Sequence, residues 1–285
     1  MEKVVKVVDE KRGIVQITTP DERWYGMQVF DHKTNLPIIE YVPSVTWICS
    51  YYPKGVGFYK WLAEKGWDES QAIKEEAGER GSRIHHGINL LLEGLTISMD
   101  QPLPNPQGVV SPLTLEEYQA LMSFAEFHKK YRPVLVAKDL TVWNQEQGYC
   151  GTLDVIWKIL PEFADKDVPA GLHLTDYKSA QGVWPSMEIQ VSSYRRTPEV
   201  DAIIFSQGET EIHLSILQVG YKKNKRGYKL TVVPDQIELF AAARTIWANE
   251  TAGQIPLQRD YPMMLKLDET PKPEAEQEAH AVATD

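Results

Sequence analysis

Three β-rich runs follow one another in the middle of the chain, and they constrain the fold more than any other feature. They cover residues 134–144, 150–160 and 171–179, and helical patterns lie on both sides of them. The turn NQEQGY joins the first two runs as a hairpin. A helix, three strands and a second helix in this order predict a mixed α/β domain whose sheet begins antiparallel.

The segments before these runs predict a second β element and three helices. Residues 13–31 have the pattern of a hairpin with TPDE as its turn. A helical stretch at about 55–66 ends at a glycine. A long helix is then expected from Asp68 as N-cap to Gly94 as C-cap.

Residues 100–112 are rich in proline and predict a loop. Thr114 is the expected N-cap of a helix that stops before Pro133. After the third β-rich run, a helix is expected at about 185–199. The segments IHLSILQVGY and YKLTVV then predict a hairpin around the turn KKNKRG, and DQIELFAAARTIWANE predicts a final helix.

The chain has no internal repeat and no second core pattern, so a single domain is expected over residues 1–267. It would comprise an N-terminal hairpin part (1–50) and a core at about 68–250. Residues 268–285 carry six acidic residues and one base, a net charge of −5, and their Pro, Ala and Glu content predicts a disordered tail. The simplest role for this tail is solubility. The alternative is a peptide that docks on a partner or mimics the charge of DNA.

Cysteine content and hydropathy predict a cytoplasmic protein without a membrane segment. The two cysteines, Cys49 and Cys150, are expected to be free thiols in a reducing compartment, and they are too few for a four-cysteine iron–sulfur cluster. No apolar run approaches the roughly 18 residues of a membrane span. The charged start MEKVVKVVDEKRG lacks the apolar stretch of a signal peptide.

The net charge of −10 argues at first against a nucleic-acid partner, because binding phosphates requires lysine and arginine. Half of that charge, however, lies in the tail. The segment YKKNKRGYK at 221–229 is strongly basic and contains Lys222, Lys223, Lys225 and Arg226. It is either a solvated hairpin tip or a contact to the DNA backbone.

An acid and a base stand near the end of the third β-rich run. Side chains alternate along a strand, so Asp176 and Lys178 share a face with Leu172 and Leu174. Asp154 interrupts the apolar GTLDVIWKIL of the preceding run, where a carboxylate is costly to bury unless it is paired or binds a metal. A surface ion pair is the simpler interpretation of Asp176 and Lys178. A functional site at the strand ends is the alternative.

Two helices would bring further polar groups to this place. Gln190 and Tyr194 are four residues apart and therefore lie on one helical face. His85 lies about 80° from the centre of the apolar stripe of the long helix and His86 about 180° from it. Only His85 can therefore lean toward the two carboxylates. The expected stripe consists of Ala77, Gly81, Ile84, Ile88, Leu91, Leu92 and Leu95.

These residue types suit a metal-dependent phosphodiesterase. Mg²⁺ and Mn²⁺ prefer oxygen ligands, which Asp154 and Asp176 offer. A bound cation activates water and offsets charge on the phosphorus. Lys178 would orient or deprotonate the attacking water, or stabilise the developing charge. His85 would add a nitrogen ligand or a general acid/base group.

Together these elements resemble the PD-(D/E)XK nuclease superfamily. The resemblance rests on four motifs: Gly151-x-x-Asp154, Asp176-x-Lys178, Gln190-x-x-x-Tyr194, and Arg80-Gly81-x-x-x-His85. The histidine and the QxxxY helix are similar to the RecB-type exonuclease branch. Residues 23–54 are similar to the opening of phage-encoded and mitochondrial genome-maintenance exonucleases. The resemblance covers roughly residues 20–230.

The resemblance implies a restriction-endonuclease-like core, a central mixed sheet flanked by helices, with the N-terminal hairpin as an extension. It implies that Asp154, Asp176, His85 and the backbone carbonyl of Tyr177 bind one or two Mg²⁺ or Mn²⁺ ions. Lys178 would be the catalytic base or an electrostatic stabiliser. Gln190 would position that lysine or the water, and Tyr194 would contact the DNA strand.

The implied activity is exonucleolytic cleavage of single-stranded or duplex DNA ends in replication, recombination or repair, in a phage or bacterium. A recombination or replication protein is a possible partner. Ser44 and Thr46 are further candidate phosphate donors. Many members have Glu where this chain has Asp139, so the role of that residue stays open. The alternatives are a nuclease-fold DNA-binding or scaffold subunit that does not cleave, and a structure-specific endonuclease of the same superfamily.

Overall fold

The computed structural model describes residues 4–19, 22–30, 36–105, 108–251 and 256. The chain divides into two compact units, residues 1–254 and 255–285, and all helices and strands described below lie in the first. The predicted acidic tail, residues 268–285, lies outside the described residues.

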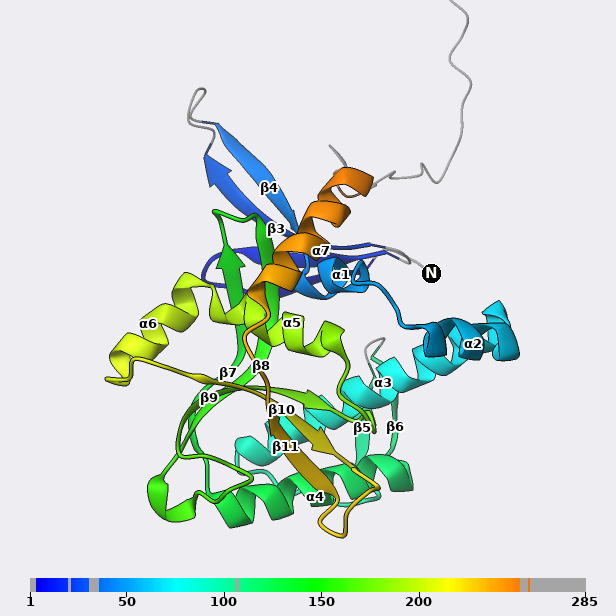
Figure 1. Cartoon of the computed structure of the whole chain (residues 1–285), viewed down its shortest axis with the longest axis vertical. Coiled ribbons are helices and arrows are strands. Elements are labelled where there is room, and N and C mark those ends of the chain that lie inside the picture. Colours follow the sequence, from blue (N-terminus) through cyan, green and yellow to red (C-terminus); the bar gives the residue numbers. More distant parts are fainter. Residues whose placement is uncertain (1–3, 20–21, 31–35, 106–107, 252–255, 257–285) are drawn as a thin grey trace, which may run out of the picture. The chain divides into compact units, whose positions relative to one another are not determined.

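A five-stranded mixed sheet forms the centre of the first unit (Figure 1). Its strands run in the order β11-β10-β9-β8-β7. β9 and β10 are parallel, and every other neighbouring pair is antiparallel. The three β-rich runs and the hairpin after them are confirmed. The strands are β7 (Val134–Asn144), β8 (Tyr149–Ile159), β9 (Gly171–Lys178), β10 (His213–Val219) and β11 (Tyr228–Val232).

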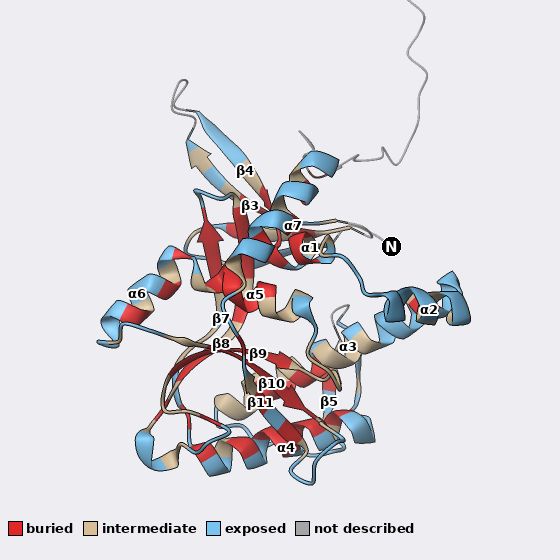
Figure 2. Ribbon diagram, in the orientation of Figure 1, coloured by how far each residue is buried: buried red, intermediate tan, exposed pale blue. Residues whose placement is uncertain are grey.

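Helices cover both faces of this sheet. Phe124 and Phe127 of α4 (Leu115–Tyr131) pack against Trp157 of β8. On the other face, Ile189 of α5 (Pro185–Arg195) lies in one core cluster with Leu174 of β9. Figure 2 shows the result: the central strands are mostly buried, and α4 is buried on the side that packs on the sheet and exposed on its outer side.

Local capping explains where α4 begins and ends. Thr114 accepts a hydrogen bond from Glu117 N, and the Glu117 carboxylate accepts one from Thr114 N, so the two residues form a capping box. Arg132 adopts a left-handed conformation after the last turn, before Pro133. The predicted start and end of this helix are confirmed.

The long helix α3 (Trp67–Leu92) begins and ends slightly earlier than the sequence indicates. Gly66, which also ends α2 (Val56–Lys65), is its N-cap, so Asp68 stands in the first turn instead. Glu93 is the C-cap, and Gly94 follows with φ of +81°. Within the expected stripe Ile84 and Ile88 are fully buried, but Leu95 lies beyond the helix and is 53 % exposed.

The N-terminal region is a four-stranded antiparallel sheet and not the predicted hairpin extension. The hairpin of the two inner strands is confirmed, although part of its turn lies outside the described residues. An outer strand pairs on each side of it: β1, which is rich in valine, pairs with β2, and β4 pairs with β3. The strands are β1 (Val4–Asp9), β2 (Ile14–Thr18), β3 (Arg23–Phe30) and β4 (Pro37–Pro43).

Three tryptophans join this sheet to two helices. Trp24 of β3, Trp47 of α1 (Val45–Ser50) and Trp247 of α7 (Ile237–Glu250) contact one another edge to face, with ring centroids 5.0–5.8 Å apart. The N-terminal sheet thereby packs on β8, and α1 packs on α5 and α7.

Two further expectations are wrong in detail. The proline-rich segment 100–112 contains a small sheet of β5 (Pro102–Pro104) and β6 (Val110–Pro112), whose carbonyls Arg83 holds from α3. The helix expected at 185–199 is two helices, because Pro198 lacks the N–H needed to continue α5 and begins α6 (Pro198–Ser206). A short 3₁₀ turn (Pro161–Phe163) precedes β9.

None of the helices in the described part of the chain is long and apolar enough to cross a membrane. Cys49 and Cys150 are buried free thiols, as predicted.

Candidate active site

A small cavity of about 230 Å³ lies where the N-terminal sheet meets the ends of β8 and β9. α3, α1 and α5 supply the rest of its wall (Figure 1). The residues that line it are Gln16, Arg23, Tyr25, Ser44, Val45, Thr46, His85, Gly151, Thr152, Asp154, Asp176, Lys178, Gln190 and Tyr194. Residues separated by more than 170 positions in the sequence therefore face one small space.

β9 brings its acid and base to the cavity on the face that α5 covers. Asp176 is 2 % exposed, and its Oδ2 atom lies 2.6 Å from Lys178 Nζ. The angles at this ion pair are too poor for a hydrogen bond, and no other donor reaches Oδ2. A buried carboxylate oxygen with so few partners is uncommon unless something else binds it.

β8 and α3 contribute a second cluster beside the first. Asp154 Oδ2 accepts a hydrogen bond from Tyr177 N at 2.7 Å, and Asp154 Oδ1 lies 3.5 Å from His85 Nδ1. The other ring nitrogen of His85 is 3.0 Å from the Tyr177 carbonyl oxygen. His85 therefore leans toward the carboxylates, whereas His86 is not among the residues that line the cavity.

The pKa values of these groups reflect burial and close charges. Burial, which Lys178 only partly offsets, raises the pKa of Asp176 to about 6. Burial would also raise the pKa of Asp154, but His85 outweighs it and lowers that pKa. Burial would lower the pKa of Lys178, but Asp176 and Asp154 together raise it. The lysine is therefore charged at neutral pH in this arrangement.

α5 fixes the lysine through a chain of hydrogen bonds. Lys178 Nζ donates to Gln190 Oε1 at 3.3 Å, and Gln190 Nε2 donates to the Tyr194 hydroxyl at 3.1 Å. The close approach of Tyr194 to β8 requires a glycine, since a Cβ atom at Gly151 would lie 2.5 Å from Tyr194 Cε1. This contact gives a packing reason for the glycine that stands three residues before Asp154.

The two candidate phosphate donors near the N-terminus also line the cavity. Ser44 is the N-cap of α1, where its hydroxyl accepts from Trp47 N and lies 3.1 Å from the Thr46 hydroxyl. Ser44 is 1 % exposed, whereas Thr46 is exposed. Thr46 is thus the more accessible of the two to an incoming group.

Sequence reasoning missed five cavity residues. One is the apolar Val45 of α1, and four are polar residues from β2, β3 and β8: Gln16, Arg23, Tyr25 and Thr152. Gln16 Nε2 donates to the Tyr25 hydroxyl at 2.7 Å, and that hydroxyl lies 3.4 Å from Thr152 Oγ1. Arg23 forms no ion pair within the described residues, so it adds a free positive charge to the wall. No local sequence pattern indicates that these residues line the cavity, because they come together only when the N-terminal sheet packs on β8.

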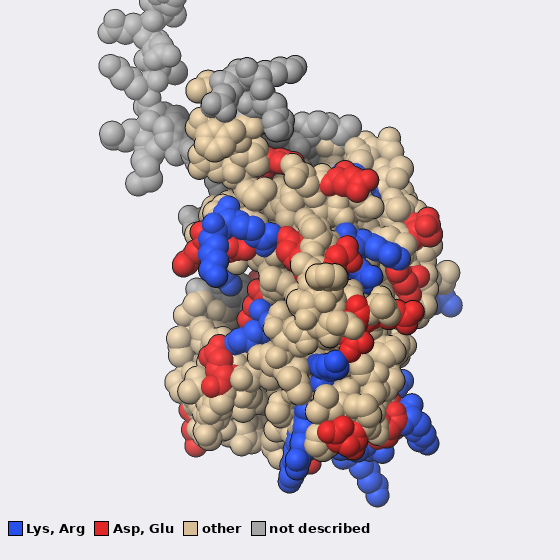
Figure 3. Space-filling model, turned by 90° about the vertical axis from the view of Figure 1, so that its left-hand side faces the viewer, with Lys and Arg blue, Asp and Glu red and all other residues tan. Residues whose placement is uncertain are grey.

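Four predicted residues lie elsewhere, as does Asp139, whose role was left open. Lys222, Lys223, Lys225 and Arg226 are on the β10–β11 turn and do not line the cavity. Asp139 has φ of +47° and accepts from Asn89 Nδ2 at 2.8 Å, so it is held outside the cavity as well. On the face in Figure 3, basic and acidic side chains are interspersed, and no broad basic surface marks a path for DNA there.

The predicted metal ligands are Asp154, Asp176, His85 and the Tyr177 carbonyl. Within the described ranges, no three His, Cys, Asp or Glu side chains form a ready-made metal cluster. Asp176 is turned to Lys178, whereas His85 and Asp154 are turned to each other. Neighbouring ligands of an octahedral cation with arms of about 2.1 Å are about 3 Å apart. The separations of 3.0 and 3.5 Å around His85 belong to its two different ring nitrogens, Nε2 with the Tyr177 carbonyl and Nδ1 with Asp154, so they do not describe two ligands of one ion.

The residues nevertheless offer the donor types that a divalent cation takes. Asp176, Asp154 and the Tyr177 carbonyl are oxygen donors of the kind that Mg²⁺ and Mn²⁺ prefer. Asp176 is paired with Lys178, so its carboxylate would have to exchange that contact to bind an ion.

No known protein-family model matches the chain, and no curated protein matches it in sequence. The resemblance to the PD-(D/E)XK superfamily thus rests on the motifs themselves and stays a prediction.

Proposed function

We propose that this protein is a divalent-cation-dependent nuclease that hydrolyses phosphodiester bonds of DNA, acting as an exonuclease. The observation that carries the proposal is the convergence of Asp154, Asp176, Lys178 and His85 on one small cavity beside an aligned Gln190–Tyr194 pair. Four motifs that are weak separately supply one constellation suited to phosphate chemistry.

A bound Mg²⁺ or Mn²⁺ would be held by Asp154, Asp176, His85 and the Tyr177 carbonyl, and it would supply a Lewis acid next to the scissile phosphate. Lys178 carries its positive charge toward the same space. Its role would be to donate hydrogen bonds to phosphate oxygens and to orient or deprotonate the attacking water. Gln190 keeps the ammonium group in place.

The size of the cavity indicates what enters it. Pockets for drug-sized ligands have volumes of about 300–1,000 Å³, and this one has about 230 Å³. A phosphate group with its attached oxygens fits better than a base with its sugar. Recognition at this point would therefore involve the backbone, which favours cleavage without strong sequence preference.

Labelled linear and closed circular DNA, in single- and double-stranded forms, test the proposal directly. The protein should degrade linear molecules in Mg²⁺ or Mn²⁺, be inactive in EDTA, and leave closed circles intact. Cleaved circles would favour the endonuclease alternative. Binding of DNA without any cleavage would favour the non-cleaving subunit.

Asp176→Asn is the control for a contaminating nuclease, because it removes one charge and keeps the shape of the side chain. Activity that survives in this variant at the wild-type level would rule out the assigned cavity as its source.

A further inference from the structure

A second and larger hollow, of about 430 Å³, lies next to the catalytic cavity. No residue lines both hollows, but α3 and the end of β9 contribute neighbouring residues to each. His85 and Lys178 line the first, and their sequence neighbours Ile84 and Ser179 line the second. A strand that leaves the catalytic cavity on this side would enter the second hollow.

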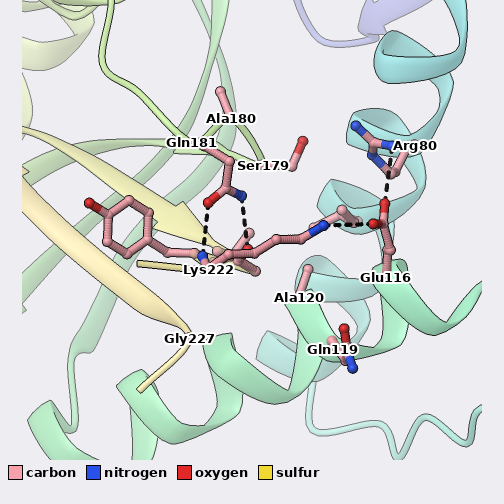
Figure 4. Close-up of a pocket in the computed structure, with 13 residues that line it drawn as sticks. Arg80, Glu116, Gln119, Ala120, Ser179, Ala180, Gln181, Lys222 and Gly227 are labelled. Atoms are coloured by element: carbon pink, nitrogen blue, oxygen red, sulfur yellow. Dashed lines mark hydrogen bonds and ion pairs between the residues drawn. The ribbon is translucent and has the colours of Figure 1, made fainter. Parts of the chain in front are cut away.

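Three charged side chains form one cluster in this hollow (Figure 4). Glu116 of α4 lies between two cations, with its Oε1 atom 2.8 Å from Lys222 Nζ and its Oε2 atom 3.3 Å from Arg80 Nη1. One carboxylate thus bridges an arginine of the long helix and a lysine of the β10–β11 turn. The cluster as a whole keeps one positive charge.

The backbone that carries Lys222 is held firmly, although its side chain is 67 % exposed. Gln181 accepts from Lys222 N at 2.8 Å and donates to the Gly220 carbonyl at 3.0 Å. Gly220 N in turn donates to Ser123 of α4 at 2.9 Å. The lysine is therefore presented from a fixed position beside the end of β9, and only its flexible arm is free to move.

The bridging carboxylate is easy to displace. The Glu116 side chain is 52 % exposed, and solvent-exposed ion pairs contribute little because water and salt screen them. A phosphate group carries at least the same negative charge and offers more acceptor oxygens, which suits an arginine–lysine pair. Exchange of the carboxylate for a phosphate would keep both cations paired.

We propose that Arg80 and Lys222 form a phosphate subsite for the nucleic-acid strand, and that Glu116 occupies it until the strand binds and displaces the carboxylate. The inference rests on the proposed function, and it deepens that function by naming a second contact to the same strand. The phosphate belongs either to the 5′ end of the strand or to an internal position, and the chemistry of recognition is the same.

The test is the affinity for a fluorescent oligonucleotide in EDTA, where binding is measured without cleavage. Glu116→Gln should tighten binding roughly two- to fivefold, because the strand no longer competes with an ion pair. Glu126→Gln removes the same charge from an exposed position of the same helix and should leave affinity unchanged. In the Lys222→Gln background, the gain from Glu116→Gln should shrink, because only the Arg80 contact is left to release.

Lys222→Gln alone should lower the slope of log affinity against log salt concentration by about 1, the loss of one phosphate contact. Comparison of 5′-phosphorylated with 5′-hydroxyl oligonucleotides identifies the source of the phosphate. If the wild type binds the 5′-phosphorylated oligonucleotide more tightly and Lys222→Gln abolishes this difference, the subsite binds the end phosphate. If the two oligonucleotides bind with equal affinity and the variants behave as described above, the subsite binds an internal phosphate.

Two results would overturn the inference: no gain in Glu116→Gln, or an equal gain with and without Lys222, which would be a general charge effect. Wild-type cleavage together with either result would leave the proposed function standing. If the variants bind as expected but the protein does not cleave DNA in Mg²⁺ or Mn²⁺, the phosphate subsite is supported and the proposed nuclease function is rejected. Absence of binding to any oligonucleotide would reject both.

Discussion

The two ends of β9 bury polar groups equally well but use them in opposite ways. At its start, His173 Nε2 donates to the Pro169 carbonyl at 2.9 Å, and the His173 ring lies 4.7 Å from that of His213. Burial lowers the pKa of His173 to about 4, so the ring is neutral at pH 7. At its end, Asp176 and Lys178 keep their charges and contact each other.

The difference lies in what the polar groups bind. The histidine is neutral and is tied through Nε2 to the backbone of its own loop, which holds that loop to the sheet. Its Nδ1 atom also lacks a hydrogen-bond partner, but His173 does not line the catalytic cavity. The ionic end is tied only to other side chains, and Asp176 Oδ2 lacks a hydrogen bond. Burial alone therefore does not identify a functional site, whereas buried charges that satisfy one another incompletely do.

The largest effect is expected when a carboxylate is removed at the ionic end of β9. We expect Asp176→Asn and Asp154→Ala each to abolish detectable cleavage, because each removes an oxygen ligand. The fold should remain, since neither change removes much core volume. Cleavage assays and circular dichroism of the same preparations test this. Full activity in Asp154→Ala would reject the assigned site.

The second largest effect is expected from the two neighbouring histidines of α3. His85→Ala should lower the cleavage rate at least about a hundredfold, the lower end for loss of a general acid/base group, and change the metal requirement. His86→Ala should stay near wild type, because His86 is not among the residues lining the cavity. Rates of both variants across Mg²⁺ and Mn²⁺ concentrations decide this. Comparable losses in the two variants would reject a specific role for His85 at the ionic end.

A third effect should come from Gly151, which reaches the ionic end only through packing. The added methyl group of Gly151→Ala meets Tyr194 at 2.5 Å and Val45 at 3.2 Å, so we expect about 1–3 kcal/mol lower stability and a reduced rate. Gly78→Ala on α3 is the matched control, because its methyl group meets no atom within 4 Å. Urea unfolding of both variants measures the difference. Equal effects would show that the Tyr194 contact is unimportant.

The smallest effect is expected at the histidine end, and it should appear only in stability. The folded-state pKa of His173 is about 4 against an ordinary 6.5, so the unfolded chain takes up the proton first. Its contribution to stability is complete above pH 6.5 and is lost as pH falls toward 4. His173→Gln should remove up to roughly 3 kcal/mol from this pH dependence, with little change in the cleavage rate at pH 7.5. Denaturant melts at pH 4.5 and 7.5 measure it. If His173→Gln lowered the cleavage rate as much as His85→Ala, the start of β9 would be as important for activity as its end.

Local patterns predicted the parts of the fold that are built from neighbouring residues. The alternation along β9 placed Asp176 and Lys178 on the face under α5, and the capping box fixed the start of α4 at Thr114. Helical spacing separated His85 from His86. These predictions succeeded because strand and helix periodicities are set within a few residues.

The parts that failed depend on docking between distant segments. Arg23 and Tyr25 line the cavity only because the N-terminal sheet packs on β8, and nothing around them in sequence indicates this. The two edge strands of that sheet, β1 and β4, were missed because each forms only by pairing with an inner strand, β2 or β3. Lys222 was expected on a solvated hairpin tip or in contact with the DNA backbone, and the structure places it in the hollow beside the catalytic cavity.

The parallel pairing of β9 with β10 also has a consequence for the order of folding. Gln218 stands beside Lys178 in the register, but the chain between them must first form α5 and α6 and cross over the sheet. His85 reaches the Tyr177 carbonyl across 92 positions. Closing loops of this length is entropically costly, so contacts of this kind form late. We therefore expect the catalytic groups to assemble near the end of folding, and a chain interrupted before α5 to be inactive however much of its sheet has formed.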